Sequence, residues 1–179
     1  MKTKVILYIA ISRDGFIADK NGSVDWLNSF CADLPPDMDC GYKDFFQSID
    51  LIVMGRKTYE QMLTFGDWPN AGKHTYVFTE STEKPEHDEI TFVNTSVQDF
   101  MKKIEQEQPD CKIWLEGGAN LVQQFHDAGL IDESIITIIP VDLTEGIALT
   151  QDLISGKGFR EVSSTDFSHG ITQKHRVKN

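Results

Sequence analysis

The chain of 179 residues is 40% hydrophobic and 25% charged, which is the composition of a globular protein with one substantial core and not of a disordered chain. Its formal charge of −11 provides no basic stripe to offset repulsion from a phosphate backbone, so we expect no nucleic-acid partner. Cys31, Cys40 and Cys111 show no CxxC spacing, which indicates a reducing cytoplasm without disulfides or zinc, and no apolar run approaches the ~20 residues that span a membrane.

Strand and helix signals alternate along residues 1–179 without a repeat or a long linker, which predicts a single domain. Residues 5–11 are β-branched and aromatic, as in a strand buried on both faces, and Asp14-Gly15 signals the turn that ends it. Residues 18–25 are polar and rich in turn formers, and Trp26 then restores apolar character. We interpret this segment as a flexible lid anchored by the tryptophan ring.

Apolar residues at helical spacing predict a short helix over residues 42–49. The strand patterns that follow cover residues 51–54, 75–78, 90–93, 112–115 and 134–140. A charged loop occupies residues 80–89. Helical patterns begin at Thr58, at Ser96 with its capping partner Asp99, and after Gly117-Gly118, where Gly129 ends the helix.

Residues 159–162 and 171–177 predict two antiparallel strands around a turn at His169-Gly170. Strands that alternate with helices and finish in a hairpin are typical of a mostly parallel sheet, covered on both faces, with an antiparallel edge. The predicted fold class is therefore a three-layer α/β domain.

Gly55-Arg56-Lys57-Thr58 lies where a buried strand gives way to a helix. The glycine allows close backbone approach, the helix N-terminus favours an anion, and Arg56 can bind phosphate oxygens with two N–H groups. The pattern favours a phosphate cradle over two ordinary solvated cations, because the helix dipole disfavours basic residues at a helix start.

Glu116-Gly117-Gly118-Ala119-Asn120 forms a second strand-to-helix junction. The glycine pair is equally consistent with a tight turn and with close approach to a ligand. Glu116 at the end of a buried strand is more informative, because a carboxylate there needs a partner. The GxGxxG and GxxxxGK[ST] fingerprints are absent, and the five histidines lack metal-ligand spacing, so we expect no metal site.

Five stretches together resemble the dihydrofolate reductase-like proteins, and within them the reductase (C-terminal) domain of the bifunctional riboflavin-biosynthesis deaminase-reductase. They are "AISRDGFIADKNGSVDWL", "VMGRKTYE", "VFTES", "WLEGGANLVQQF" and "LIDESIITIIPV". The resemblance covers nearly the whole chain. It implies a dihydrofolate reductase-like fold with a central mixed sheet of about eight strands, an NADPH site and a homodimer.

Position by position, the resemblance implies that Ala10 and Ile17 flank the nicotinamide, with the loop through Asn21 and Gly22 closing over it. Trp26 would border the substrate. The rest of the implied cofactor site is Gly55, Arg56, Lys57, Thr58, Phe78, Thr79, Gly117, Gly118, Ala119 and Asn120.

Several positions depart from the family pattern. Glu80 falls near the expected 2′-phosphate, where a unit charge would cost between ~1 kcal/mol in water and ~4 kcal/mol at an effective dielectric near 20, so NADH is an alternative to NADPH. Asn120 falls where dihydrofolate reductases can have an arginine, and the segment "PVDLTEGIALT" departs from the riboflavin-type pattern at the substrate end. The acidic residue that serves the pterin in dihydrofolate reductase corresponds to Asp39 or to Asp33, depending on the direction of counting.

Glu116 matches the "EGG" of riboflavin-type reductases, where it lies at the substrate site. The resulting hypothesis is a cytoplasmic NAD(P)H-dependent reductase that transfers hydride to a pteridine-like or ribosylaminopyrimidine-like small molecule, with Asp39, Asp33 and Glu116 as candidate proton donors or substrate-orienting groups. The alternative is a non-catalytic nucleotide-binding protein that retains the fold.

Overall fold

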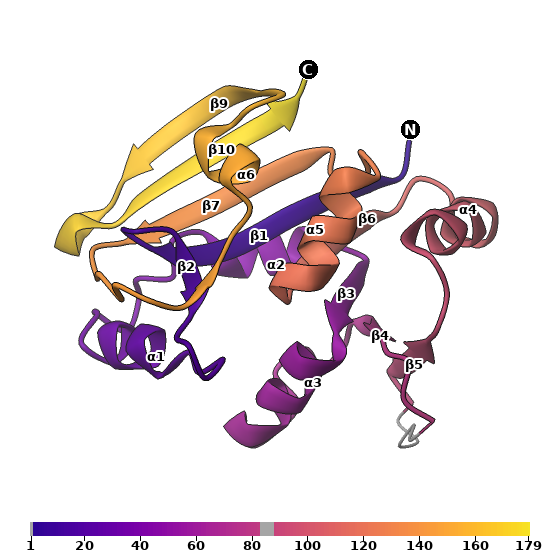
Figure 1. The fold of residues 1–179 in the computed structure, drawn as a ribbon, viewed down its shortest axis with the longest axis horizontal. Coiled ribbons are helices and arrows are strands. Elements are labelled where there is room, and N and C mark those ends of the chain that lie inside the picture. Colours follow the sequence, from indigo (N-terminus) through magenta and orange to yellow (C-terminus); the bar gives the residue numbers. More distant parts are fainter. Residues whose placement is uncertain (1, 83–87) are drawn as a thin grey trace. The chain divides into compact units, whose positions relative to one another are not determined.

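The structure is a computed structural model that describes residues 2–82 and 88–179 (Figure 1). The strands are β1 (Lys4–Ser12), β2 (Phe16–Ala18), β3 (Leu51–Gly55), β4 (His74–Phe78), β5 (Ile90–Val93), β6 (Lys112–Gly117), β7 (Glu133–Ile139), β8 (Ile147–Ala148), β9 (Phe159–Asp166) and β10 (Thr172–Lys178). The α-helices are α1 (Asp25–Ala32), α2 (Tyr42–Ser48), α3 (Arg56–Met62), α4 (Val97–Glu107), α5 (Ala119–Asp127) and α6 (Gln151–Ser155). The charged loop expected at 80–89 lies partly outside the described residues, at 83–87.

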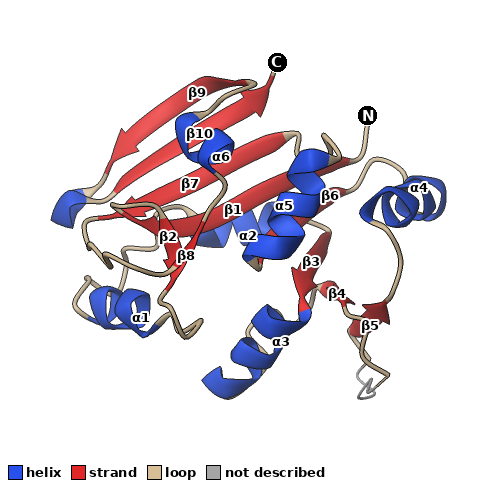
Figure 2. Ribbon diagram, in the orientation of Figure 1, coloured by secondary structure: helices blue, strands red, loops and turns tan. Residues whose placement is uncertain are grey.

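One mixed sheet contains eight strands in the order β5-β4-β3-β6-β1-β7-β10-β9, and β2 pairs with β8 in a separate two-stranded sheet (Figure 2). The pairs β1–β6, β3–β6, β3–β4 and β4–β5 are parallel, whereas β7–β10 and β10–β9 are antiparallel. The predicted α/β class, with a mostly parallel sheet and an antiparallel C-terminal hairpin, is confirmed.

The chain divides into two compact units, each built from two stretches of sequence. Unit 1 contains residues 1–7 and 48–132, and unit 2 contains residues 8–47 and 133–179. No single sequence boundary therefore separates them, and the single domain expected over residues 1–179 stays a prediction.

The core of unit 1 forms around the parallel strands. Leu51, Ile52, Val53 and Met54 of β3 are all at most 3% exposed. Because successive side chains of a strand point to opposite faces, this run shows that β3 is covered on both faces. Helices α4 and α5 contribute the apolar stripes Val97, Phe100, Met101, Ile104, Leu121, Val122 and Phe125.

Helix ends in unit 1 follow the local signals in the sequence. Ser96 Oγ accepts a hydrogen bond from the Asp99 amide at the start of α4, so the predicted N-cap is confirmed. Gly129 adopts φ 65°, and its amide and that of Leu130 donate to the carbonyls of His126 and Phe125 beyond the end of α5. The predicted glycine stop is therefore also confirmed.

Unit 2 contains the hairpin β9–β10 packed in register beside β7. Strand β9 runs to Asp166, four residues beyond the predicted end at Val162, and seven of its eight side chains are exposed. Its position at the edge of the sheet explains why an apolar pattern did not mark its full length.

Regular structure that the sequence analysis missed flanks the segment interpreted as a flexible lid, whose residues 19–24 form no helix or strand. Residues Phe16 and Ala18 pair with Ala148 and Ile147, and α1 begins at Asp25. A Cβ on Gly146 would lie 2.3 Å from the Ala18 carbonyl oxygen, so this glycine permits the close approach of the two strands. The pairing joins residues far apart in the chain, and a local pattern could not reveal it.

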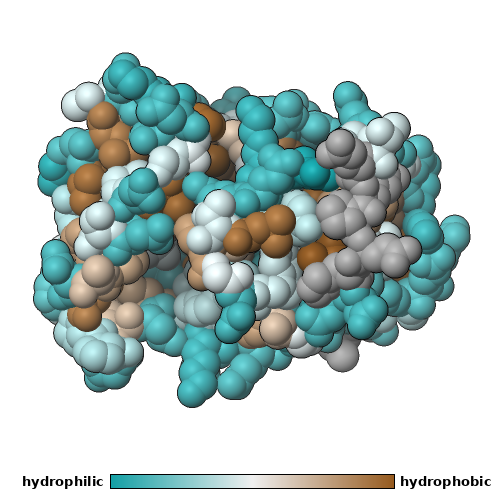
Figure 3. All heavy atoms as spheres, turned by 90° about the horizontal axis from the view of Figure 1, so that it is seen from below, coloured by the Kyte–Doolittle hydropathy of each residue, from teal (hydrophilic) through white to brown (hydrophobic). Residues whose placement is uncertain are grey.

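The face of the molecule in Figure 3 is mostly hydrophilic, and hydrophobic residues appear there in separate patches. Large hydrophobic side chains that are more than a third exposed include Tyr42, Leu63, Phe65, Ile147 and Val162. Among the described residues, none of the helices is long and apolar enough to cross a bilayer.

Candidate functional site

Two strand-to-helix junctions of unit 1 lie at the same edge of the sheet. Strand β3 leads directly into α3 at Gly55, and β6 leads into α5 through Gly117 and Gly118. Because β3 and β6 are parallel neighbours, with Met54 opposite Gly117, their carboxyl ends coincide. The Gly118 amide donates a 2.9 Å hydrogen bond to Thr58 Oγ1. The structure thus brings the two predicted glycine junctions together.

The second junction has the backbone geometry of a close approach. Gly117 has φ 143° and Gly118 has φ 34°, in the range that favours glycine, and a Cβ on Gly118 would meet Thr58 Oγ1 at 3.3 Å. Within residues 2–82 and 88–179, no side chain caps the start of α5, and its first turn carries no acidic residue. The first amides of this helix are therefore suited to an anionic group. Asn120, in the same turn, accepts a hydrogen bond from Gln124 through Oδ1.

Gly55 is less constrained than the second pair of glycines. Its backbone is extended, and a Cβ there would lie 3.8 Å from the Gly117 carbonyl oxygen, an ordinary contact. The chain itself therefore does not require glycine at position 55.

Arg56 is held by its own helix. Its Nε donates to Glu60 Oε1 over 2.6 Å, and its guanidinium lies 5.7 Å from the Tyr59 ring centroid and 5.6 Å from that of Phe92. The side chain is 22% exposed. The spacing of Arg56 and Glu60 is i,i+4, so the sequence contained the signal for this ion pair. Lys57, the next residue, is exposed.

The end of β4 carries the residues that the resemblance places at the adenosine. Phe78 makes edge-on contacts with Phe100 and Phe125, at 5.1 and 6.2 Å between ring centroids. Thr79 Oγ1 accepts from the Ser81 amide at 3.0 Å, and Glu80 is exposed. Phe78 thus joins the aromatic core of unit 1, and its role towards a ligand stays a prediction.

Glu116 has a polar partner, Asn70, that the sequence analysis missed. Asn70 Nδ2 donates to Glu116 Oε2 over 2.7 Å, and the Asn70 side chain is fully buried. Burial raises the pKa of Glu116 from 4.5 to about 8, although the hydrogen bond from Asn70 acts in the opposite direction. Glu116 is thus a half-buried acid that holds its proton near neutral pH, beside Gly117 and Gly118.

The remaining predicted residues lie in unit 2. Ala10 on β1 and Ile17 on β2 are both half-buried. Trp26, in the first turn of α1, is half-buried too, and its Nε1 has no hydrogen-bond partner in the part of the chain that the structure describes. Asp33 is exposed directly after α1.

Asp39 serves as a turn carboxylate at the start of α2. Its two oxygens accept from the amides of Lys43 and Gly41, at 3.0 and 2.9 Å. The bonds from Lys43 and then Gly41 lower the pKa of this carboxyl from its usual value. Asp39 also lines an open pocket of about 340 Å³. A depressed pKa favours a group that orients or attracts a substrate over one that donates a proton, so Glu116 is the stronger candidate acid.

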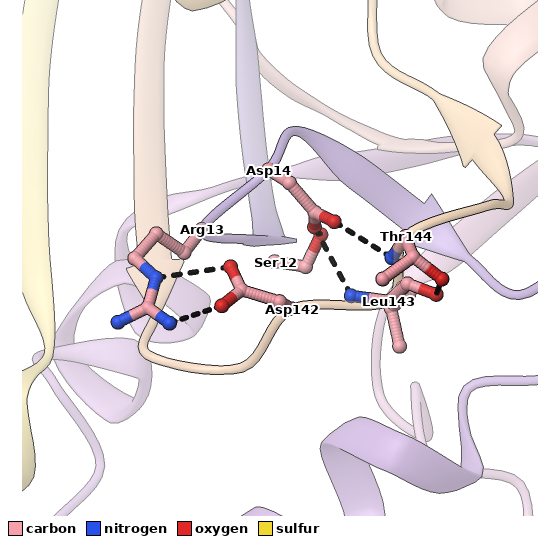
Figure 4. Close-up of polar contacts among 6 residues, drawn as sticks. All are labelled: Ser12, Arg13, Asp14, Asp142, Leu143 and Thr144. Carbon is pink, nitrogen blue, oxygen red and sulfur yellow. Dashed lines mark hydrogen bonds and ion pairs between the residues drawn. The ribbon is translucent and has the colours of Figure 1, made fainter.

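A polar cluster in unit 2 fixes the loop between β1 and β2 (Figure 4). Asp14 accepts from Ser12 Oγ at 2.6 Å and from the amides of Leu143 and Thr144 at 3.2 and 2.7 Å. Arg13 forms a two-bond ion pair with Asp142. These contacts tie the segment after β1 to "DLT" at residues 142–144, within the stretch that departs from the riboflavin-type pattern.

Residues 2–82 and 88–179 contain no group of three His, Cys, Asp or Glu side chains that could hold a metal ion.

The sheet order and the helices define a dihydrofolate reductase-like fold. Among solved structures, the chain matches dihydrofolate reductase from Enterococcus faecalis in complex with NADP(H), with a TM-score of 0.67, 15% identity and coverage of 98% of this chain and 96% of that one. It also matches the Thermotoga maritima deaminase/5-amino-6-(5-phosphoribosylamino)uracil reductase with a TM-score of 0.72 and 16% identity, over 99% of this chain and 57% of that one. At these identities the likeness concerns the fold alone.

The chain belongs to the RibD C-terminal domain family, whose sequence model matches residues 3–173. The uncharacterized protein YwjB of Bacillus subtilis (strain 168) is 38% identical over 179 residues, 99% of each chain. A Shewanella sp. PV-4 protein named for riboflavin biosynthesis has a structure similar to this one, with a TM-score of 0.85, 31% identity and coverage of 100% of this chain and 99% of that one.

Proposed function

We propose that this protein is an NAD(P)H-dependent reductase of a pteridine-like or ribosylaminopyrimidine-like small molecule, as in riboflavin biosynthesis. The observation that carries the proposal is the arrangement at the end of β6. There a half-buried acid immediately precedes a glycine pair and the start of α5, which no described side chain caps. Such a reaction requires the protein to provide a phosphate-binding site for the cofactor and a proton donor for the substrate.

The residues present fit a dinucleotide. The first amides of α5 and the left-handed backbone of Gly118 suit a pyrophosphate, and Lys57 offers an exposed cation to the same junction. Thr58 holds the Gly118 amide in place. The nicotinamide, when bound, supplies the hydride. Ala10 and Ile17 are the proposed nicotinamide neighbours, and Trp26 the proposed substrate neighbour.

Glu116 would act as the general acid. As the substrate carbon of a C=N bond gains the hydride, the nitrogen gains the Glu116 proton, and the side chain becomes a carboxylate that Asn70 Nδ2 stabilises. A pKa of about 8 keeps the proton available at neutral pH. Asp39 and Asp33 would orient polar groups of the substrate.

A first experiment tests the cofactor. Intrinsic fluorescence from Trp26, Trp68 and Trp114 would be titrated with NADPH and separately with NADH. Saturable quenching supports the proposal. We expect Glu80→Gln to strengthen NADPH binding, because a carboxylate near the 2′-phosphate costs ~1 to ~4 kcal/mol, and to leave NADH binding unchanged. Absence of saturable binding by both nucleotides would contradict the proposal.

A second experiment tests turnover. Oxidation of the preferred nucleotide would be followed with dihydrofolate and with a phosphoribosylamino-pyrimidine as substrates. Turnover that is lost in Glu116→Gln while nucleotide affinity is retained supports an acid role for Glu116. Nucleotide binding without turnover of either substrate would favour the alternative, a non-catalytic nucleotide-binding protein.

We further propose that the protein is a homodimer and acts in the cytoplasm. The exposed edge strand β9, with Val162 51% exposed, offers an unpaired sheet edge to a second copy, and three free thiols suit a reducing compartment. Sedimentation equilibrium tests the first point. A monomer across the accessible concentration range would contradict it.

A further inference from the structure

Asn70 is a fully buried polar side chain beside Glu116 in the proposed site of unit 1. It lies in the segment between the short helix Leu63–Phe65 and β4, and its side chain has 0% exposure. Its Nδ2 donates to Glu116 Oε2 over 2.7 Å. Its Oδ1 is also buried and has no hydrogen-bond partner among the described residues. Because a buried carbonyl oxygen without a donor is destabilising, this atom needs a physical explanation.

The protonation state of Glu116 supplies one. An ionised carboxyl only accepts hydrogen bonds, so it can satisfy Asn70 Nδ2 and not Oδ1. A protonated carboxyl has an O–H group as well, and a carboxamide oxygen is a suitable acceptor for it. The carboxamide of Asn70 therefore contains a complementary group for each state of Glu116.

We propose that Asn70 is the positioning residue of Glu116, whose carbonyl oxygen accepts the proton of the carboxylic acid and whose amide N–H stabilises the carboxylate. Only the catalytic use of the Glu116 proton rests on the proposed function; the hydrogen bonding between Asn70 and Glu116 does not. It explains how one side chain can hold the Glu116 proton before transfer and then support the charge that the transfer leaves behind.

The surroundings of Glu116 agree with this assignment. Burial is the main cause that raises its pKa, and the hydrogen bond from Asn70 is the opposing one. Among residues 2–82 and 88–179, no ionisable side chain contributes to the shift. Asn70 is thus the polar group through which the protein acts on this carboxyl, and burial supplies the rest.

Infrared spectroscopy of the protein without nucleotide tests the inference. The carbonyl band of protonated Glu116 would be assigned by its loss in Glu116→Gln and followed across the pKa of about 8. In Asn70→Leu, which has a similar volume and no polar atoms, we expect the band to move to higher wavenumber because the O–H loses its acceptor. The acid dissociation constant of Glu116 should fall about fivefold, because the charge-assisted bond to the carboxylate is roughly twice as strong as a neutral bond.

Asn94→Leu is the matched control, since it removes an exposed amide from the same unit. It should change neither the band nor the titration. If Asn70→Leu does not fold, Asn70→Asp replaces it: two adjacent carboxyls should titrate in coupled steps and keep one proton to higher pH than Glu116 alone.

A purely structural role for Asn70 would lower the melting temperature and leave the Glu116 band and titration in place, which would overturn the inference. The outcome is independent of the proposed function. A shifted band in a protein that binds neither nucleotide would support Asn70 and contradict the reductase. An unshifted band with intact NADPH binding would contradict the role of Asn70 and leave the reductase supported.

Discussion

The amide of Gly118 donates to the hydroxyl of Thr58 across two strand-to-helix junctions, over 2.9 Å. Residues 60 positions apart in the chain are joined there by a single hydrogen bond. Since β3 and β6 are parallel neighbours, this bond fixes the spacing between the starts of α3 and α5. The proposed phosphate cradle therefore depends on one hydroxyl group.

Thr58→Val keeps the shape of the side chain and removes the acceptor. We expect unfolding free energy to fall by about 1 kcal/mol, because the Gly118 amide loses its partner, and NADPH affinity to fall with it. Urea unfolding and fluorescence titration measure the two effects. Thr58→Ser retains the oxygen and should stay close to the native protein; equal losses in both variants would show that the methyl group, and not the hydrogen bond, matters.

Gly118→Ala tests the backbone of the same junction. With φ 34° and only 3.3 Å between a new Cβ and Thr58 Oγ1, the variant combines backbone strain with crowding, and we expect a loss of about 1–3 kcal/mol in stability. Gly72→Ala is the control, since Gly72 has φ 85° and no atom of the described residues lies within 4 Å of a new Cβ. The difference between the two variants isolates the crowding. If Gly118→Ala loses no more stability than Gly72→Ala, crowding against Thr58 Oγ1 does not contribute.

Because the pKa of Glu116 is raised in the folded protein, we expect the free energy of unfolding to depend on pH. Between 4.5 and about 8 the folded protein holds a proton that the unfolded chain has released, so the free energy of unfolding should fall as pH rises through this window and level off above it. The slope is at most about 1.4 kcal/mol per pH unit. Glu116→Gln removes this slope, so its stability relative to the native protein should increase with pH.

Urea unfolding at a series of pH values measures this effect. Glu105→Gln, at an exposed position of α4, is the matched control and should follow the native protein. Parallel curves for the native protein and Glu116→Gln would contradict a raised pKa.

Asp14→Ala should loosen the residue 142–144 segment more than Arg13→Ala does. The carboxylate of Asp14 accepts from two backbone amides, whereas Arg13 and Asp142 form an exposed ion pair of the kind that contributes little. Limited proteolysis across this segment compares the variants, and equal cleavage rates would contradict the ranking.

The sign of the pH effect at Asp14 is opposite to that at Glu116. Although burial raises the pKa of Asp14, hydrogen bonds from Ser12, Thr144 and Leu143 lower it on balance. The stabilisation is therefore present above the unfolded value of 3.8 and is lost as pH falls through the lower folded value. The cleavage rate of the native protein in this segment should rise in acid as Asp14 becomes protonated. The cleavage rate of Asp14→Ala should not rise for this reason, because the variant has no carboxyl group there.

Local chemistry made much of unit 1 predictable. Uninterrupted apolar runs identified β3 and β6, Ser96 identified the start of α4, and Gly129 the end of α5, because each signal acts within a few residues. The junction at Gly117 and Gly118 was also visible, since its backbone conformation favours glycine. These features depend on the chain near them and on little else.

Contacts between distant residues escaped the sequence analysis. Asn70 meets Glu116 from 46 positions away, within a turn-rich segment without periodicity. Strands β2 and β8 contain three and two residues, too few to show alternation, and they pair only because Gly146 allows the backbones to meet. The partner of each such residue is set by the fold and not by its neighbours in sequence.

The small β2–β8 sheet shares no strand with the eight-stranded sheet, so its local unfolding is not coupled to unfolding of the core through a common strand. A ribbon of so few residue pairs can open without disturbing the ladder of the larger sheet, in the manner of local unfolding. Its amides should therefore exchange with solvent hydrogen far faster than those of β3 or β6, and at a rate governed by how firmly Asp14 holds the adjoining segment.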